Sequence, residues 1–170
     1  MLSYRRPLYV MPVAGATLTA AAEALLVYDV MIRAGQLERD SVLKATIFGK
    51  ASNAVTTPGT LTLRARWGGL AGTILATSGA LTQNVIAQTD VTWKWEMYLH
   101  CLSLGASGTI LAVGAMERSN QAAAAVADMR PDLIPASAPA AVTVDLTIDK
   151  LLSFTAEPSL TTASITAPAP

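Results

Sequence analysis

The sequence predicts an all-β fold, an antiparallel β-sandwich for which a jelly roll is the favoured topology and an immunoglobulin-like arrangement the alternative. Three observations predict it. Apolar and polar residues alternate over several segments, which is the pattern of strands with one buried face. One glycine-rich turn sequence occurs twice, each time after such a segment. Gly and Pro turn signals separate about eight strands at regular spacing.

The first 60 residues are predicted to contain an arm and two strands. Residues 1–20 form an extended N-terminal arm, because two prolines keep this segment out of a helix. Leu26–Ile32 alternates and predicts a strand. Leu43–Phe48 predicts a second strand that ends at Gly49, and Asn53–Gly59 is then a loop with a Pro-Gly turn signal.

Two hairpins of one design follow. Gly69–Ala76 reads GLAGTILA and Gly105–Ala112 reads GASGTILA, and the alternating strands Leu61–Trp67 and Val91–Leu102 precede them. The glycines supply the positive φ angles that a tight reversal needs. The predicted returning strands are Thr73–Thr77 and Thr109–Met116.

The rest of the chain reads as shorter strands and connections. Val142–Asp149 has the clearest alternation, with its apolar residues Val142, Val144, Leu146 and Ile148 on one face. The sandwich is predicted to span residues 21–160, and residues 161–170 form a C-terminal tail. The other predicted elements are an edge strand at Asn84–Ala87, a helical stretch at Asn120–Met129, a spacer at Pro135–Pro139, and weaker strands at Leu152–Ala156 and Ser164–Thr166.

Strand parity argues against a cysteine nucleophile. Trp93, Trp95 and Cys101 share the core-facing parity of their strand, whereas His100 has the opposite parity and faces solvent. The only histidine and the only cysteine therefore point away from each other and cannot act as base and nucleophile. No cofactor and no enzymatic activity are expected.

Metal sites have little support in the sequence. A lone His and a lone Cys cannot build a closed zinc site. Asp145 and Asp149 share a face of one predicted strand, but four residues of strand separate them by roughly 13 Å. Glu38 and Asp40 lie in a loop, where they could join a calcium site, although solvated loop carboxylates are far commoner.

The polar faces of the hairpin strands carry opposite charges. Arg64 and Arg66 alternate on one strand, and Lys94 and Glu96 alternate on another. If these two strands are neighbours, an Arg66–Glu96 ion pair is expected across them. The alternative is that all four side chains are solvated and contribute little to stability.

The composition favours contacts between proteins. Of the 170 residues 52% are hydrophobic and only 14% are charged, where soluble domains carry roughly a quarter charged residues. An obligate homo-oligomer fits this composition, because its interfaces resemble a divided core. The net charge is zero and no basic cluster exists beyond Arg5 and Arg6, so nucleic acid is not an expected partner. No apolar run reaches the roughly 18–20 residues of a membrane helix, so no membrane partner is expected.

The hairpin residues resemble a family of small structural proteins of tailed bacteriophages, the head decoration (cement) and head-fibre type proteins. The similarity covers about residues 24–155 and lies in three motifs: TLTLRARWGG at Thr60–Gly69, GTILA at Gly72–Ala76, and SLGASGT at Ser103–Thr109 after the Trp93–Leu99 strand. The resemblance implies a jelly-roll sandwich, typically trimeric, that attaches to the outside of a capsid and has no catalytic residues.

The expected function is therefore that of a non-enzymatic virion protein, made in the host cytoplasm, that trimerises and stabilises the capsid surface by binding the major capsid protein. The arm is the segment expected to reach a neighbour, for example as a strand added to an open sheet edge. Its candidate partner-binding residues are Leu2, Tyr4, Arg5, Arg6, Leu8, Tyr9 and Val10. One alternative is a tail-fibre or receptor-binding domain that recognises a host glycan. Another is a secreted hydrolase, because the arm loosely imitates a signal peptide with cleavage near Ala16.

Overall fold

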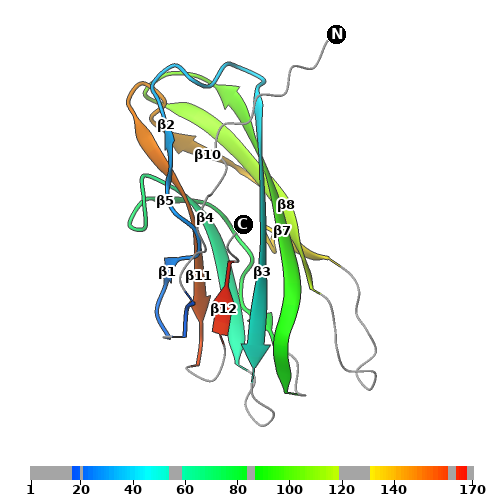
Figure 1. Cartoon of the computed structure of the whole chain (residues 1–170). Coiled ribbons are helices and arrows are strands. Elements are labelled where there is room, and N and C mark those ends of the chain that lie inside the picture. The colour runs from blue at the N-terminus through cyan, green and yellow to red at the C-terminus, as the bar shows by residue number, and fades with distance from the viewer. Residues whose placement is uncertain are drawn as a thin grey trace.

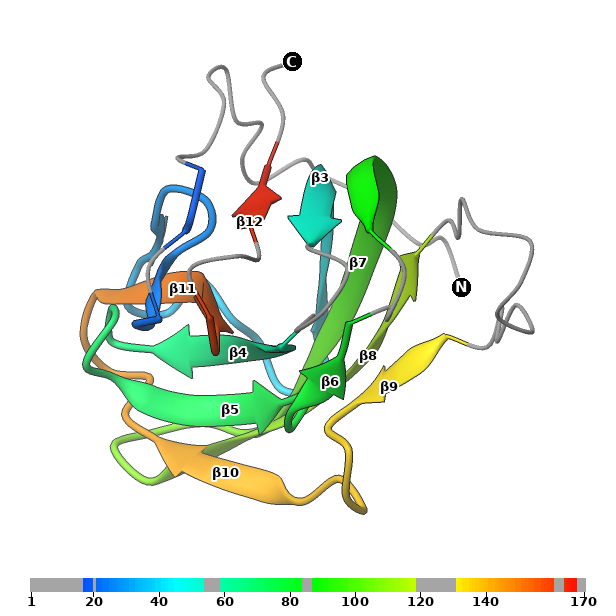
Figure 2. The ribbon, with the colours of Figure 1, turned by 90° about the horizontal axis from the view of Figure 1, so that it is seen from below.

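The computed structural model describes residues 17–19, 21–53, 59–83, 87–118, 131–160 and 164–167. These residues form two antiparallel sheets with six strands each, which are the two layers of a sandwich (Figures 1 and 2). The predicted all-β sandwich is confirmed, and the choice between jelly-roll and immunoglobulin-like topology stays a prediction.

The first layer, the β4–β11 sheet, has the order β1-β11-β4-β5, with β2 also paired to β11 and β6 to β4. The second layer, the β3–β7–β8 sheet, has the order β10-β8-β7-β3-β12, with β9 paired to β8. The strands of the first layer are β1 (Ala24–Leu25), β2 (Val30–Ile32), β4 (Thr60–Trp67), β5 (Thr73–Thr77), β6 (Leu81–Thr82) and β11 (Lys150–Pro158). Those of the second are β3 (Val42–Asn53), β7 (Gln88–Ser103), β8 (Gly108–Arg118), β9 (Asp132–Ile134), β10 (Ala141–Val144) and β12 (Ser164–Thr166).

Both predicted hairpins are present, as β4–β5 and β7–β8. The repeated sequence makes the same turn in each: the Gly72 N–H donates to the Gly69 carbonyl (2.8 Å), and the Gly108 N–H donates to the Gly105 carbonyl (3.1 Å). Gly69 and Gly105 both have positive φ, at 85° and 103°. The spacing of the glycines therefore correctly predicted a tight turn in both hairpins.

The predicted core face of the hairpins is confirmed. Trp93, Trp95 and Cys101 are all buried. The ring of Trp95 meets Phe154 of the opposite sheet edge to face, with centroids 5.3 Å apart and an interplanar angle of 88°. This contact joins β7 to β11 through the middle of the core.

The prediction that a strand ends at Gly49 is wrong, because β3 runs through this residue to Asn53. Gly49 lies opposite Trp93 in the register of β3 and β7. A Cβ atom at position 49 would lie 2.1 Å from Cζ2 of the Trp93 ring. Gly49 therefore lies inside a strand, and its missing side chain leaves space for the indole ring of Trp93.

The single strand predicted over Leu26–Ile32 is also wrong. The chain forms the short strands β1 and β2, and residues 26–29 leave the ladder between them. Leu26 turns into the core and its N–H donates to the Phe154 carbonyl (2.9 Å), whereas Tyr28 is exposed. The Asp29 carboxylate accepts a hydrogen bond from Ser153, which holds this irregular segment against β11.

The strand predicted over Val142–Asp149 ends early, at Val144. Asp145 Oδ1 accepts hydrogen bonds from the backbone N–H (2.8 Å) and the hydroxyl (2.6 Å) of Thr147. This local turn competes with the ladder. Ile148, predicted to face the core, is consequently exposed.

The other short elements have mixed outcomes. Ser164–Thr166 forms β12 as predicted, and Leu152–Ala156 lies within the longer strand β11. The predicted spacer Pro135–Pro139 connects β9 to β10 without a strand. A short strand in this region, β6, lies at Leu81–Thr82, and the edge strand predicted at Asn84–Ala87 stays a prediction. Residues 84–86, the helix predicted within Asn120–Met129 and residues 1–16 of the arm lie outside the described residues.

Candidate functional site

The predicted separation of His100 and Cys101 is confirmed. Cys101 is buried, and this burial raises the pKa of its thiol. His100 Nε2 lies on the outer side of β7, 3.9 Å from the carboxylate of Asp40. A buried thiol with a raised pKa is a poor nucleophile, so these two residues form no catalytic pair.

The four candidate metal ligands lie in different local structures. Asp145 caps its own turn, as described above, and Asp149 Oδ1 accepts a hydrogen bond from the Ala34 N–H (2.8 Å). Asp40 has a positive φ of 65° and faces His100, while the Glu38 carbonyl accepts a hydrogen bond from the Ser41 N–H (3.1 Å). Across the described part of the chain, no group of three His, Cys, Asp or Glu side chains is placed to hold a metal ion.

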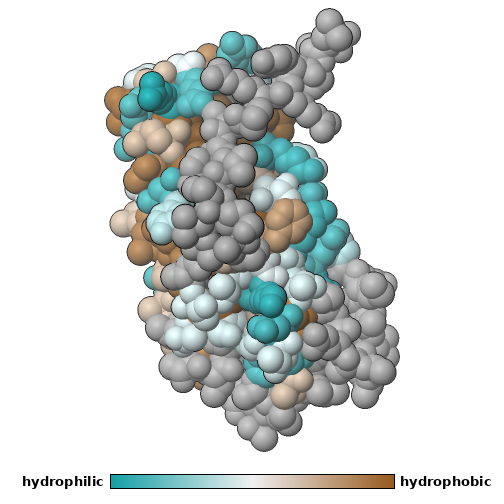
Figure 3. Space-filling view, viewed as in Figure 1, coloured by the Kyte–Doolittle hydropathy of each residue, from teal (hydrophilic) through white to brown (hydrophobic). Residues whose placement is uncertain are grey.

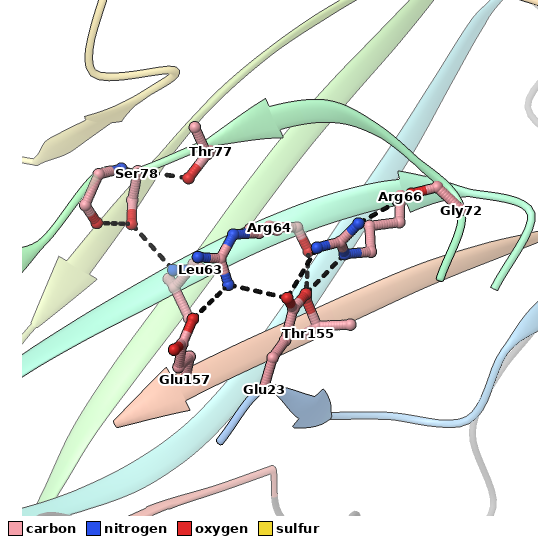
Figure 4. Close-up of polar contacts among 10 residues, drawn as sticks. Glu23, Leu63, Arg64, Arg66, Gly72, Thr77, Ser78, Thr155 and Glu157 are labelled. Atoms are coloured by element: carbon pink, nitrogen blue, oxygen red, sulfur yellow. Dashed lines mark hydrogen bonds and ion pairs between the residues drawn. The ribbon is translucent and has the colours of Figure 1, made fainter. Parts of the chain in front are cut away.

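A network of charged and hydroxyl side chains covers the outer face of the β4–β11 sheet (Figure 4). Glu23, which precedes β1, receives two parallel hydrogen bonds from Arg66, at 2.6 and 2.7 Å, and a hydrogen bond from the Thr155 hydroxyl. Arg64 Nη1 lies 3.0 Å from Glu23 and donates to Glu157 at 2.7 Å. Arg66 also donates to the Gly72 carbonyl (2.8 Å), which ties the network to the first hairpin turn.

The Arg66–Glu96 ion pair predicted from the sequence is wrong. Arg66 lies on β4 and Glu96 lies on β7, and these strands belong to different sheets. Each residue has partners on its own sheet, because Arg66 binds Glu23 and Glu96 binds two lysines. The alternation of polar and apolar residues correctly predicted which side of each strand faces outward, but it did not predict which strands are neighbours.

The network clamps residues 23–29 onto β11. Partial burial alone would raise the pKa of Glu23, but hydrogen bonds from Arg66 and Thr155 and the charge of Arg64 outweigh it and lower that pKa. The Ser153 hydroxyl donates to Asp29 further along the same segment. Because these polar groups are paired with one another, they hold residues 23–29 against the sheet.

The outer face of the β3–β7–β8 sheet is open by comparison, and we call it the open face. Its exposed apolar side chains include Val42, Phe48 and Leu133, at 54%, 54% and 68% exposure. In Figure 3, hydrophilic and hydrophobic residues are interspersed over the described surface. The other members of the open face are Lys44, Thr46, Lys94, Glu96, Tyr98, His100, Leu111, Val113 and Ala115.

One chain of ion pairs crosses the middle of the open face. Glu96 Oε1 lies 3.0 Å from Lys94 Nζ and 3.2 Å from Lys44 Nζ. The Lys44 ammonium also lies 5.3 Å from the centroid of the Tyr98 ring. Hydrogen bonds from Lys94 and Lys44 lower the pKa of Glu96. Glu117 Oε2 lies 4.0 Å from Lys94 Nζ, so the two lysines face two carboxylates. The exposed large apolar side chains of β3 on this face are Val42 and Phe48.

The open face borders an incompletely paired edge. β12 pairs with β3 only at Lys50–Ser52, and in the described ranges no strand lies beside Val42–Phe48 on that side. Next to β12, Leu18 and Ile165 exchange two backbone hydrogen bonds, at 2.9 and 3.1 Å. The end of the predicted arm thus joins this edge of the sheet through β12.

Sequence reasoning predicted a partner-binding arm and did not identify the open edge of β3. Leu2, Tyr4, Arg5, Arg6, Leu8, Tyr9 and Val10 lie outside the described residues. Alternation shows which face of a strand is buried, but not whether the strand lies at an edge. The signal available for β3 was its pair of lysines, Lys44 and Lys50, because edge strands commonly carry lysine.

Comparisons with known proteins identify no relatives of this chain. A scan with family models gives no match, and searches of curated proteins and of solved structures also give no significant match. No helix among the described residues is long and apolar enough to cross a membrane.

Proposed function

We propose that this protein is a non-enzymatic virion component of tailed bacteriophages, a capsid decoration protein with a jelly-roll sandwich. In this proposal it assembles as a trimer, binds the major capsid protein on the outer surface of the shell and stabilises it. The hairpin motifs resemble such proteins, as described above. The observation that carries the proposal is the contrast between two outer faces: a polar network ties a chain segment onto one sheet, whereas Val42, Phe48 and Leu133 are exposed on the other.

The mechanism in this proposal is adhesion rather than chemistry. Burying apolar surface contributes about 25 cal/mol per Å², and the side chains of Val42, Phe48 and Leu133 are available for such burial. Each contact is weak, but attachment of an oligomer at several points multiplies the affinity. The predicted arm at residues 2–13 supplies a further point of attachment.

The test measures occupancy on capsids that lack the protein. Purified wild type and variants are added to these capsids, sedimented with them and located by electron cryomicroscopy. We expect Phe48→Ser to lower occupancy and deletion of residues 2–13 to abolish it. Tyr28→Ser is a matched control, because Tyr28 is 56% exposed but lies on the segment that covers the other sheet. Full occupancy of all variants, or binding to host cells in place of capsids, would contradict the proposal and favour the receptor-binding alternative.

A further inference from the structure

Within the described part of the chain, no strand pairs with the backbone groups along the open edge of β3. Leu18 and Ile165 form a doubly hydrogen-bonded pair, so the backbone of Ile165 faces Leu18 and its neighbours Ser164 and Thr166 face β3. Their partners on β3 are Ser52 and Lys50, which therefore direct their N–H and C=O groups toward this edge. By the same alternation Val42, Lys44, Thr46 and Phe48 direct theirs to this side of β3.

The lysine that would guard this edge is turned away from it. An edge strand is commonly protected by a lysine side chain that extends past it. Lys44 instead lies over β7, with its Nζ 3.2 Å from Glu96 and 5.3 Å from the centroid of Tyr98. The Lys44 ammonium therefore lies toward β7, and no described strand pairs with β3 at Lys44 and Thr46.

The open segment has a natural centre. It begins at Val42, the first residue of β3, and ends at Phe48, because β12 occupies the edge from Lys50 onward. Ala45 is the midpoint of these seven residues. An added strand therefore gains the most hydrogen bonds when its own centre lies opposite Ala45.

The sequence of β3 is complementary to itself about this centre. With two antiparallel copies centred on Ala45, Val42 of one copy lies opposite Phe48 of the other, and Lys44 lies opposite Thr46. On the inner side Leu43 lies opposite Ile47. Apolar cross-strand pairs of this kind stabilise a sheet, whereas like charges directly opposite destabilise it.

Neighbouring registers are worse. A shift of the centre to Lys44 places the two Lys44 side chains directly opposite each other. A shift to Ile47 places Lys44 opposite Lys50. A shift to Thr46 leaves Val42 opposite Lys50, whose edge β12 already occupies. Only the register centred on Ala45 pairs all seven residues without a charge conflict.

We propose that two copies of this chain pair edge to edge through Val42–Phe48, antiparallel and about a two-fold axis at Ala45, to form one continuous sheet. About eight hydrogen bonds join the two strands in this arrangement. A two-fold contact cannot close a trimer, so the contact goes beyond the proposed function and joins copies from different trimers or forms dimers in solution. Its test needs no capsid, so its failure is distinguishable from failure of capsid binding.

Disulfide trapping tests the register. Ala45 is the best position for a cysteine, because in this register the two copies of Ala45 lie directly opposite each other. They form a non-hydrogen-bonded pair with Cα atoms about 4.5 Å apart, which is within disulfide range. In a Cys101→Ala background, we expect Ala45→Cys to give a covalent dimer under mild oxidation and Thr46→Cys to give little. A dimer with Thr46→Cys but not with Ala45→Cys, or with neither, overturns the proposal.

A proline variant tests the edge without relying on a new cysteine. The Thr46 N–H points to the open side, so Thr46→Pro removes an outward donor and keeps the bonds between β3 and β7. Ile47→Pro is the matched control, because the Ile47 N–H points toward β7 and its loss destabilises the fold. By sedimentation, Thr46→Pro should weaken self-association at least about tenfold while the chain stays folded. Unchanged association contradicts the proposal.

The arm is the competing occupant of this edge. A chain with both Leu8→Cys and Ala45→Cys distinguishes the two cases, again in the Cys101→Ala background. A disulfide between positions 8 and 45, with no dimer from Ala45→Cys alone, assigns the edge to the arm and overturns the two-fold pairing. A dimer through position 45 in both variants supports it.

Discussion

The outer faces of the two sheets contain similar charged residues but use them differently. On the β4–β11 sheet, Arg66 and Glu23 are only 13% and 18% exposed and belong to a network with Thr155. On the β3–β7–β8 sheet, Lys44 and Glu96 are 46% and 26% exposed and belong to a chain of ion pairs with Lys94. The difference teaches that ion pairs become structural clamps where a chain segment covers them, whereas on the face that no described segment covers the pairs and the apolar side chains stay exposed.

Removal of the clamp carboxylate is expected to have the largest effect. Glu23→Ala leaves Arg66 and the buried Thr155 hydroxyl without their acceptor, which should cost about 2–3 kcal/mol of unfolding free energy. Chemical denaturation measures this change. Glu117→Ala is the control, because Glu117 is an exposed carboxylate 4.0 Å from Lys94 on the other sheet and should have no measurable effect. Equal effects of the two variants would remove the distinction between the faces.

The same comparison shows how far the sequence could predict this molecule. The two hairpins were predictable because their strands are neighbours in the chain and a glycine turn fixes their reversal. The position of β11 between β1 and β4 was not, because its partners lie far away in the sequence. A polar face such as Ser153 and Thr155 has the same alternation whether water or another segment covers it. For this reason the sequence predicted an Arg66–Glu96 pair, or else solvated side chains, where the structure has a partly buried network around Glu23.

The sequence predicted that the protein has a surface for binding other proteins, but not where that surface lies. Composition indicated surfaces for other proteins, but the open edge depends on which strand ends a sheet, and alternation carries no such information. Gly49 illustrates the limit. A glycine after an alternating run favours the end of a strand, yet here it makes room for Trp93, which is 44 residues away in the sequence but directly opposite in the ladder.

The hydrogen bond from Ser153 to Asp29 should contribute less to the free energy of unfolding than the contacts of Glu23. Ser153→Ala removes the donor to Asp29 and should cost about 1–2 kcal/mol of unfolding free energy, because the carboxylate stays only partly buried. Denaturant titration detects this loss. Thr46→Ala on the open face removes an exposed hydroxyl and should change stability by less than about 0.5 kcal/mol. A Ser153→Ala protein as stable as wild type would mean that residues 26–29 are held by Leu26 alone.

Acid should weaken the clamp around Glu23. The pKa of Glu23 is lower in the folded protein than its ordinary value of 4.5, so its contribution is fully present above pH 4.5 and is lost as the pH falls through the lower folded value. Unfolding free energies measured from pH 7 to pH 3 should fall below about pH 4.5. Glu23→Gln should flatten that decline more than Glu96→Gln, because the pKa of Glu96 is also lowered but its ion pairs are more exposed and are screened by solvent. A decline unchanged by Glu23→Gln would assign the acid sensitivity to other carboxylates.

The smallest expected effect is the coupling between Lys44 and Glu96. Both side chains lie on the open face, where solvent screens their attraction and each lysine competes with the other for the same carboxylate oxygen. A double-mutant cycle of Lys44→Ala and Glu96→Ala should therefore give a coupling close to the error of the measurement at low salt and none at high salt. The corresponding cycle of Arg66→Ala and Glu23→Ala is the reference, and its coupling should persist in salt. A salt-resistant Lys44–Glu96 coupling in the assembled protein, but not in the monomer, would mean that association covers this pair, as pairing at the adjacent β3 edge requires.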